Sequence, residues 1–295
     1  DPGGRRDAGE TYVVFGRDAA SGGFPSSIQL ADLDGTTGFR LDGIDANDRI
    51  GSSVASAGDV NGDGVDDLII GARDADPGGR GFAGETYVVF GRGPASGGFP
   101  SSIQLADLDG TTGFRLDGID ERDYSGFSVA SAGDVNGDGV DDLIIGALFG
   151  DPGGRRDAGE TYVVFGRDAA SGGFPSSIQL ADLDGTTGFR LDGIDANDRI
   201  GSSVASAGDV NGDGVDDLII GARDADPGGR GFAGETYVVF GRGPASGGFP
   251  SSIQLADLDG TTGFRLDGID ERDYSGFSVA SAGDVNGDGV DDLII

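Results

Sequence analysis

The chain has 295 residues, of which 60 are glycine, and its 52 acidic and 20 basic residues leave a formal net charge of -32. That charge excludes nucleic acid and anionic membranes as natural partners and attracts cations. Without cysteine or histidine there are no disulfides, thiolate sites or imidazole bases, so most hydrolase and oxidoreductase chemistry is hard to assemble. No apolar run approaches the roughly 18 residues of a membrane span, and the opening residues contain no signal-peptide core, so we expect a mature segment or an excerpt without membrane insertion.

A period of 75 residues organises the whole sequence. The stretch DPGGRRDAGETYVVFGR begins at Asp1 and returns, with small changes, at Asp76, Asp151 and Asp226. Residues 1–145 are identical to residues 151–295, whereas the two units within each half differ at 12 positions. The period predicts a single repeat domain over 1–295 with units 1–75, 76–150, 151–225 and 226–295. Identity this complete is typical of a recent duplication or of an engineered protein.

Each unit contains four predicted strands and a candidate fifth. In chain order the four are ETYVVFGR (10–17), GFRLDGI (38–44), SSVASAGDV (52–60) and DLIIGA (67–72), which alternate or are rich in β-branched and aromatic residues. Between the first two, IQLADL is the candidate extra strand and DGTTG is a turn signal. No unit shows the helical periodicity that a parallel α/β sheet needs.

These strands predict an all-β fold, namely a β-propeller of antiparallel four-stranded blades, with four 75-residue units. A β-sandwich is the structural alternative, although it does not require four equal units. If SSVASAGDV is the first strand of each blade, then the sequence begins just before the third strand of one blade and stops after the second strand of another. We expect residues 1–45 and 276–295 to complete one shared blade, because pairing of the terminal strands removes a free sheet edge. An excerpt of a longer array, or two chains paired into a larger ring, is the alternative.

An aspartate-rich loop lies between SSVASAGDV and DLIIGA. It reads D-x-N-x-D-G-x-x-D and starts at Asp59. Oxygen ligands on alternate residues converge within a tight loop, and calcium accepts six to eight oxygens with flexible geometry, whereas magnesium demands a stricter octahedron. We predict a calcium site whose ligands are Asp59, Asn61, Asp63, the Val65 carbonyl and Asp67, with water.

The residues after the loop discriminate between calcium-binding motifs. An EF-hand needs Glu at the twelfth position followed by a helix, and a dockerin needs Asp there, but this sequence has Ile70. We therefore interpret the loop as a hairpin tip between two strands. The alternative to metal binding is a turn capped by its own side chains. Asp66 is expected to face solvent or to support the loop from outside, and DLDGTTG and LDGIDANDR are interpreted as turns.

The stretch GSSVASAGDVNGDGVDDLIIGA followed by GETYVVFG resembles the FG-GAP repeat of integrin alpha-subunit propellers and their bacterial relatives. The resemblance covers all four units. It implies an extracellular or cell-surface protein with one calcium ion between the first two strands of each blade, about four Ca2+ in total. The same ligand roles then fall on Asp134, Asn136, Asp138, Val140 and Asp142, on Asp209, Asn211, Asp213, Val215 and Asp217, and on Asp284, Asn286, Asp288, Val290 and Asp292.

The differences between paired units indicate a second surface. Ten of the 12 differences lie in or beside two connections, the one after DLIIGA and the one before SVASAG. In an up-and-down blade these two connections share one face, opposite the hairpins that carry the aspartate loops. Aromatic residues near arginine are typical of recognition surfaces. The candidate partner-binding residues are Arg49, Arg73, Phe82, Tyr124, Phe127, Leu148 and Phe149. The alternative is packing between blades.

These features favour a calcium-binding extracellular propeller that serves as an adhesion, scaffolding or self-assembling module and is not an enzyme. Its ligand would be a protein or a glycan, with self-association left open. One alternative is an accessory domain of a secreted enzyme, because related bacterial repeats accompany catalytic modules. Another is an engineered symmetric propeller without a natural ligand.

Overall fold

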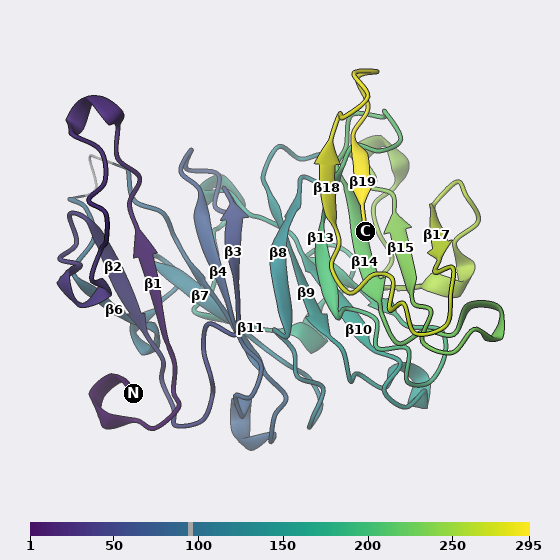
Figure 1. Cartoon of the computed structure of the whole chain (residues 1–295), viewed down its shortest axis with the longest axis horizontal. Helices are drawn as coiled ribbons and strands as arrows, with labels where there is room; N and C mark the ends of the chain where they lie inside the picture. The colour runs from purple at the N-terminus through teal and green to yellow at the C-terminus, as the bar shows by residue number, and fades with distance from the viewer. Residues whose placement is uncertain (94–96) are drawn as a thin grey trace.

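The computed structural model describes residues 1–93 and 97–295 and consists of neighbouring β-sheets joined by short loops (Figure 1). Within these residues the helical elements are three-residue 3-10 turns, so the predicted all-β, propeller-type fold is confirmed. The turns are η1 Pro2–Gly4, η2 Ala19–Ser21, η3 Leu30–Asp32, η4 Pro77–Gly79, η6 Leu105–Asp107, η7 Pro152–Gly154, η8 Ala169–Ser171, η9 Leu180–Asp182, η10 Pro227–Gly229, η11 Pro244–Ser246 and η12 Leu255–Asp257.

Three complete four-stranded blades have the predicted strand order. Blade A contains β3 Ser53–Gly58, β4 Asp67–Ala72, β5 Glu85–Val89 and β7 Gly113–Asp117. Blade B contains β8 Ser128–Gly133, β9 Asp142–Ala147, β10 Glu160–Val164 and β12 Gly188–Asp192. Blade C contains β13 Ser203–Gly208, β14 Asp217–Ala222, β15 Glu235–Val239 and β17 Gly263–Asp267. Neighbouring strands within each blade pair antiparallel, so every blade combines two strands from one unit with two from the next.

The candidate fifth strand forms in three of the four units, but it joins the neighbouring sheet. It corresponds to β6 Ser102–Gln104, β11 Ser177–Gln179 and β16 Ser252–Gln254, each followed by a 3-10 turn over Leu-Ala-Asp, whereas the first unit has only the turn η3. The three strands pair in parallel with β2 Gly38–Asp42, β7 and β12, respectively, at the outer edge of the preceding sheet. The segment that contains each of these strands therefore links one sheet to the next, and we call it a strap. The strand pattern alone did not predict this link.

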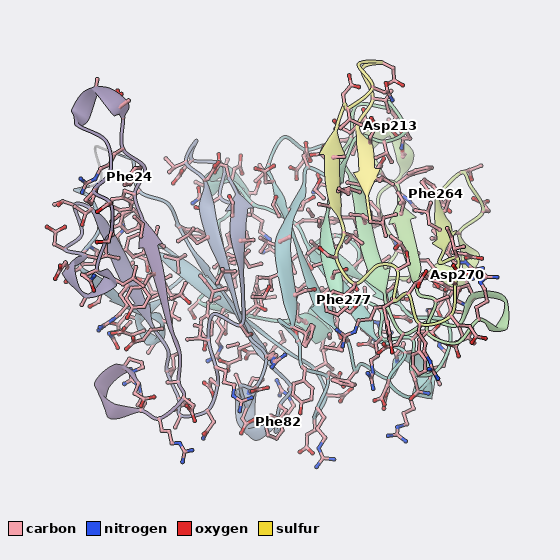
Figure 2. The ribbon with its side chains drawn as sticks, viewed as in Figure 1. Phe24, Phe82, Asp213, Phe264, Asp270 and Phe277 are labelled. Carbon is pink, nitrogen blue, oxygen red and sulfur yellow. The ribbon has the colours of Figure 1, made fainter. Side chains whose placement is uncertain are left out.

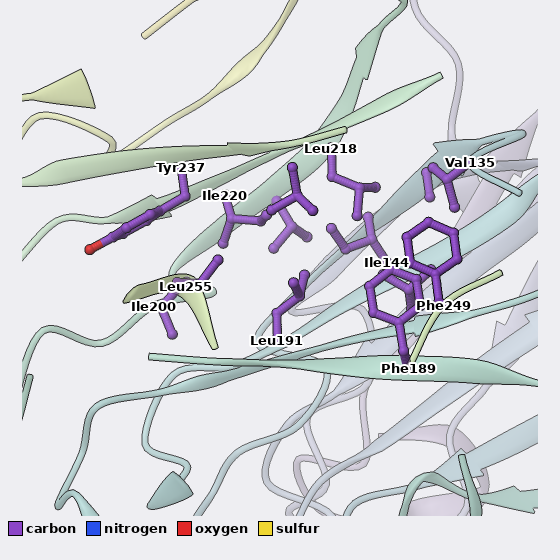
Figure 3. Packing of buried hydrophobic residues seen from close by; sticks show 14 of the residues in the cluster. Val135, Ile144, Phe189, Leu191, Ile200, Leu218, Ile220, Tyr237, Phe249 and Leu255 are labelled. Carbon is purple, nitrogen blue, oxygen red and sulfur yellow. The ribbon is translucent and has the colours of Figure 1, made fainter. Parts of the chain in front are cut away.

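The hydrophobic core lies between sheets. One cluster combines Ile144 and Phe189 of blade B with Leu218 and Tyr237 of blade C and with Phe249, which precedes β16 (Figure 3). Phe189 is fully buried and stacks on Phe249 with ring centroids 4.2 Å apart. Similar clusters lie at the other sheet-to-sheet boundaries. Because each sheet buries its faces only against its neighbours, the repeats stabilise one another in series.

The predicted shared blade is not formed in this structure. The chain begins with β1 Glu10–Val14 and β2 Gly38–Asp42 and ends with β18 Ala280–Gly283 and β19 Asp292–Ile294. Within the described residues β1 pairs with β2 and β19 pairs with β18, and the two pairs belong to different sheets at opposite ends of the array (Figure 1). Neighbouring sheets contact one another along their first strands, β3 with β8, β8 with β13 and β13 with β18. The expected pairing of 1–45 with 276–295 is therefore corrected here.

Candidate functional site

The aspartate loops are hairpin tips, as predicted. We call residues 59–67 loop A, 134–142 loop B, 209–217 loop C and 284–292 loop D. Loop A connects β3 to β4, whose last paired residues are Gly58 and Asp67. A register shift between Ser56 and Gly58 widens the hairpin at this point. Each of the four loops joins the first two strands of its sheet, and Asp213 marks loop C at one end of the sheets in Figure 2.

Side chains of loop A hold its own backbone. The Asp59 carboxylate accepts hydrogen bonds from the amides of Asp63 at 2.9 Å and of Gly64 at 2.7 Å. Oδ1 of Asn61 also accepts from the Asp63 amide, and Oδ1 of Asp63 accepts from the Val65 amide at 3.0 Å. Equivalent bonds recur in loops B, C and D. The loops thus have the self-capped turn that was the alternative to a metal site.

The ninth-position aspartate anchors each loop from beneath. In loop A, Oδ2 of Asp67 accepts from the Val60 amide at 3.1 Å and Oδ1 accepts from the Gly91 amide at 2.7 Å. Asp67, Asp142 and Asp217 are fully buried. Ion pairs in the described residues engage other carboxylates, such as Asp117 with Arg115. The buried carboxylates therefore lack a cationic side chain as counter-charge.

Burial makes the charged form of these aspartates costly. It raises the pKa of Asp67 to about 7, and the charges of Asp63 and Asp59 add to the shift despite the two amide bonds that oppose it. Burial likewise raises the pKa of Asp217 to about 6 and that of Asp142 well above its ordinary value. A bound cation would offset this cost by supplying the missing positive charge.

The residues present fit a hard cation by chemistry. Every predicted ligand offers oxygen, and none of the described loops contains a nitrogen or sulfur ligand of the imidazole or thiolate type. The carboxylates now turn toward backbone amides, however, and the described residues contain no group of three acidic side chains arranged to hold a metal ion. The complete ligand set therefore stays a prediction.

The predicted turn at DGTTG is confirmed. Oδ1 of Asp109 accepts hydrogen bonds from the amides and hydroxyls of both Thr111 and Thr112. These bonds, with that from the Thr111 hydroxyl the strongest, lower the pKa of the exposed Asp109 to about 2. The Asp109 carboxylate therefore accepts hydrogen bonds from the residues of its own turn.

The predicted partner residues gather around one groove of about 700 Å³. All seven line it, namely Arg49, Arg73, Phe82, Tyr124, Phe127, Leu148 and Phe149. The groove lies at the end of the sheets opposite the aspartate loops, as the positions of Phe82 and Asp213 show (Figure 2). Arg223 also lines it, so residues from three successive units meet on one face.

Aromatic rings form the centre of this groove. Phe82 stacks on Tyr124 with centroids 5.6 Å apart, and Tyr124 meets Phe149 at 5.4 Å. Phe82 is 43% exposed, whereas Leu148 is buried. The guanidinium of Arg199, from the next unit, lies 4.9 Å from the Phe149 ring. Leu148 and half-buried Phe149 thus contribute to packing between blades, whereas Tyr124 is half-buried in the groove and Phe82 is exposed.

Sequence reasoning missed the acidic side of the groove. Asp48, Asp74 and Asp76 also line it, and Asp74 forms an ion pair with Arg49 at 3.0 Å. Burial, followed by the charges of Asp45, Asp76 and Asp74, raises the pKa of Asp48 to about 6. Asp48 and Asp76 are conserved between the two kinds of unit, so a comparison of their differences could not reveal them.

A family model for the FG-GAP repeat matches residues 50–89, 125–164 and 200–239. The chain carries FG-GAP repeats. Each matched segment runs from the start of the first blade strand, through the aspartate loop, to the end of the third strand. Loops A, B and C are therefore part of the FG-GAP repeat itself, and loop D, which has the same sequence, lies outside the matched residues.

Curated relatives include integrin alpha subunits. The chain is 29% identical to integrin alpha-PS2 of Drosophila melanogaster over 290 residues, which is 96% of this chain and 18% of that protein. It is 31% identical to integrin alpha-V of Gallus gallus over 250 residues, 83% of this chain and 20% of that protein. It is also 35% identical to phosphatidylinositol-glycan-specific phospholipase D of Bos taurus over 172 residues, 58% of this chain and 18% of the enzyme. The FG-GAP chain thus spans about a fifth of the length of these relatives. None of its described helices is long and apolar enough to cross a membrane.

Proposed function

We propose that this chain is a calcium-stabilised propeller module that acts outside the cell in adhesion, scaffolding or self-assembly, without catalysis. The observation that carries the proposal is the buried ninth-position aspartate, which lacks a cationic side chain as counter-charge in loops A, B and C. Similarity to integrin alpha subunits, which are cell-surface proteins, supports the location. Calcium bound at the loops would supply positive charge where carboxylates crowd.

The chain's own residues define how such a site would work. Asp67 would offer a carboxylate from beneath the loop, while Asp59, Asn61 and Asp63 would turn oxygens inward and Val65 would offer its carbonyl. Loops B, C and D repeat the same donors, so about four ions would bind. The loop backbone is already held in a tight turn by these side chains, which reduces the ordering that binding would require.

Thermal unfolding with and without calcium tests this function. Binding adds about 2.7 kcal/mol per site when free calcium is 100 times the dissociation constant, so chelation with EDTA should lower the Tm by several degrees or more. A variant with Asp67, Asp142 and Asp217 each changed to Asn should lose most of this shift. Asp109→Asn, in a turn outside the loops, should keep it. Equal Tm values in calcium and in EDTA for the unaltered chain would rule out the calcium role.

We further propose that the groove on the opposite face binds a protein partner. Exposed Phe82 and half-buried Tyr124 offer apolar contact. Asp48, Asp74 and Asp76 line the groove together with Arg49, Arg73 and Arg223, so a protein segment that presents apolar side chains and charges of both signs would fit it. The integrin alpha relatives support a role in adhesion. The binding experiment described next would also detect a glycan partner.

Binding can be screened on an array of arginine-containing and acidic peptides together with neutral glycans. Tyr124→Ala should weaken binding of the selected peptides by about 30-fold or more, the size typical of a central aromatic residue at an interface. Tyr274 is the matched control, because it occupies the same repeat position and its ring lies 5.8 Å from that of Phe232, but it is not among the residues that line the groove. Equal losses in both variants, or binding only to glycans, would contradict a protein partner at this groove.

The second candidate is an accessory domain of a secreted enzyme. Similarity to phosphatidylinositol-glycan-specific phospholipase D favours it, although the match covers only 18% of that enzyme. Under this alternative the FG-GAP chain would still bind calcium but would position a catalytic domain rather than a partner protein. Loss of hydrolase activity on removal of these repeats from a longer protein would support it.

A further inference from the structure

The eighth residue of loops B, C and D reaches the loop of the preceding blade. Oδ2 of Asp141 in loop B accepts a hydrogen bond from the Asp59 amide of loop A at 2.8 Å. Asp216 of loop C bonds the Asp134 amide in the same way at 2.9 Å, and Asp291 of loop D bonds the Asp209 amide at 3.0 Å. This residue was expected to face solvent or to support the loop from outside; Asp66 is exposed, and its three copies each support the loop of the neighbouring blade.

Backbone contacts reinforce this bridge. The Asp141 amide donates back to the Asp59 carbonyl at 3.4 Å, and the Arg167 amide donates to the Val60 carbonyl at 2.9 Å. Glycine is required opposite the bridging carboxylate, because a Cβ on Gly58 would lie 2.2 Å from Oδ2 of Asp141. Loop A is thus held between its own strands and two segments of blade B.

Loop D shows what a loop is like without this bridge. No described residue follows it to supply an equivalent of Asp141. Its internal bonds are the same as those of the other loops, including Val285 amide to Asp292 at 2.9 Å. However, Val285 is 72% exposed, whereas Val60 of loop A is fully buried. The next blade therefore covers each loop without creating its internal turn.

We propose that Asp141, Asp216 and Asp291 couple neighbouring loops, so that calcium binding in one blade favours binding in the next. This proposal rests on the proposed calcium function. Asp141 contacts loop A, and the adjacent Asp142 is the buried anchor of loop B. Asp141 and Asp142 are joined by one peptide bond. An ion that holds loop A in place would therefore, through Asp141, also fix Asp142 at the start of β9, which anchors loop B. The bridging aspartates are positioning residues, and the loops form a linear series.

Isothermal titration calorimetry with calcium tests the coupling. It compares the variant Asp141→Ala with the variant Asp66→Ala. Both substitutions remove one carboxylate at the same place in the repeat, but only Asp141 bridges two loops. The unaltered chain should bind calcium with a Hill coefficient greater than one. Asp141→Ala should lower that coefficient and weaken part of the binding within the about 5- to 150-fold range of coupled sites, whereas Asp66→Ala should leave the coefficient unchanged.

A second pair of variants tests the same bridge from the receiving side. A Cβ on Gly133 would lie 2.2 Å from Oδ2 of Asp216, but a Cβ on Gly283 would meet nothing within 4 Å. Both glycines have positive φ, 72° and 65°, so replacement by alanine strains the backbone equally. Gly133→Ala should reduce the Hill coefficient, and Gly283→Ala should not. Asp141→Leu, which keeps the branched shape of the side chain but has no oxygen to accept the Asp59 amide, replaces Asp141→Ala if the alanine variant does not fold.

The outcomes separate the two proposals. If the unaltered chain binds no calcium, the proposed function fails and the coupling fails with it. If the unaltered chain binds calcium with a Hill coefficient of one, or if the Asp141 and Asp66 variants give superimposable titrations, the calcium function stands and the coupling is overturned.

Discussion

Asp123 is a buried carboxyl at the groove end of blade B. Its pKa is raised to about 8, first by burial and then by the charges of Glu160, Asp120 and Asp151. The equivalent Asp198 is shifted to about 7 for the same reasons. Because the folded state keeps the proton while the unfolded chain releases it near pH 4, folding becomes less favourable as the pH rises from about 4 to about 8.

Asp123→Asn should remove the part of the pH dependence of folding stability that Asp123 contributes, while the part from Asp198 remains. The slope contributed by one such group is at most about 1.4 kcal/mol per pH unit, so the variant should be more stable than the parent at pH 8 and similar to it at pH 4. Urea unfolding at saturating calcium measures this, since it keeps the loops constant. Asp273→Asn is the control, because that residue occupies the same repeat position but is exposed. A parallel pH dependence in parent and Asp123→Asn would contradict the argument.

At the scale of elements, β11 and the segment before it bind one blade to the previous one. Phe174 stacks on Phe114 of β7 with ring centroids 4.1 Å apart, and Nε2 of Gln179 donates to Asp117 at 2.6 Å. Phe174 is only 8% exposed. Each strap therefore contributes buried apolar area between two sheets.

Phe174→Ala should destabilise the chain by about 3–5 kcal/mol, because it leaves a cavity against Phe114. Phe24→Ala changes the same repeat position where the ring is 53% exposed, so its effect should stay within about 0.5 kcal/mol. Chemical denaturation of both variants gives the comparison. Similar losses would mean that the strap does not stabilise the boundary between blades.

The molecule as a whole carries 52 acidic residues against 20 basic ones. Mutual repulsion of these charges opposes the compact state, and dissolved salt screens it over a Debye length of about 10 Å at 0.1 M and about 3 Å at 1 M. In EDTA, raising sodium chloride from about 0.1 M to about 1 M should therefore raise the Tm. Calcium at millimolar concentration, with far lower ionic strength, should raise it further if the loops bind specifically. A Tm that falls or stays constant with sodium chloride would show that repulsion is not a main destabilising force.

The extent of sequence-based prediction can be judged from particular residues. The alternation in SVASAG and the aliphatic run DLIIGA predicted the hairpin that carries loop A, since both signals are local to the strands. Arg49 and Tyr124 were predicted to share a face because up-and-down connections alternate between two ends of a sheet, and the groove confirms that placement. The destination of IQLADL was not predictable, because its partner strand belongs to the preceding sheet.

The sequence by itself determined the repeat, the strand order within a blade, the loops at the hairpin tips and the oxygen chemistry of their side chains. These properties depend on residues a few positions apart, whose spacing is visible in the chain. Only the tertiary structure decided how blades meet: Asp141 bridges to Asp59 across 82 residues, and β1 and β19 stay in separate sheets. The reason is physical, since the angle between neighbouring sheets and the reach of a side chain across their boundary depend on how buried faces pack.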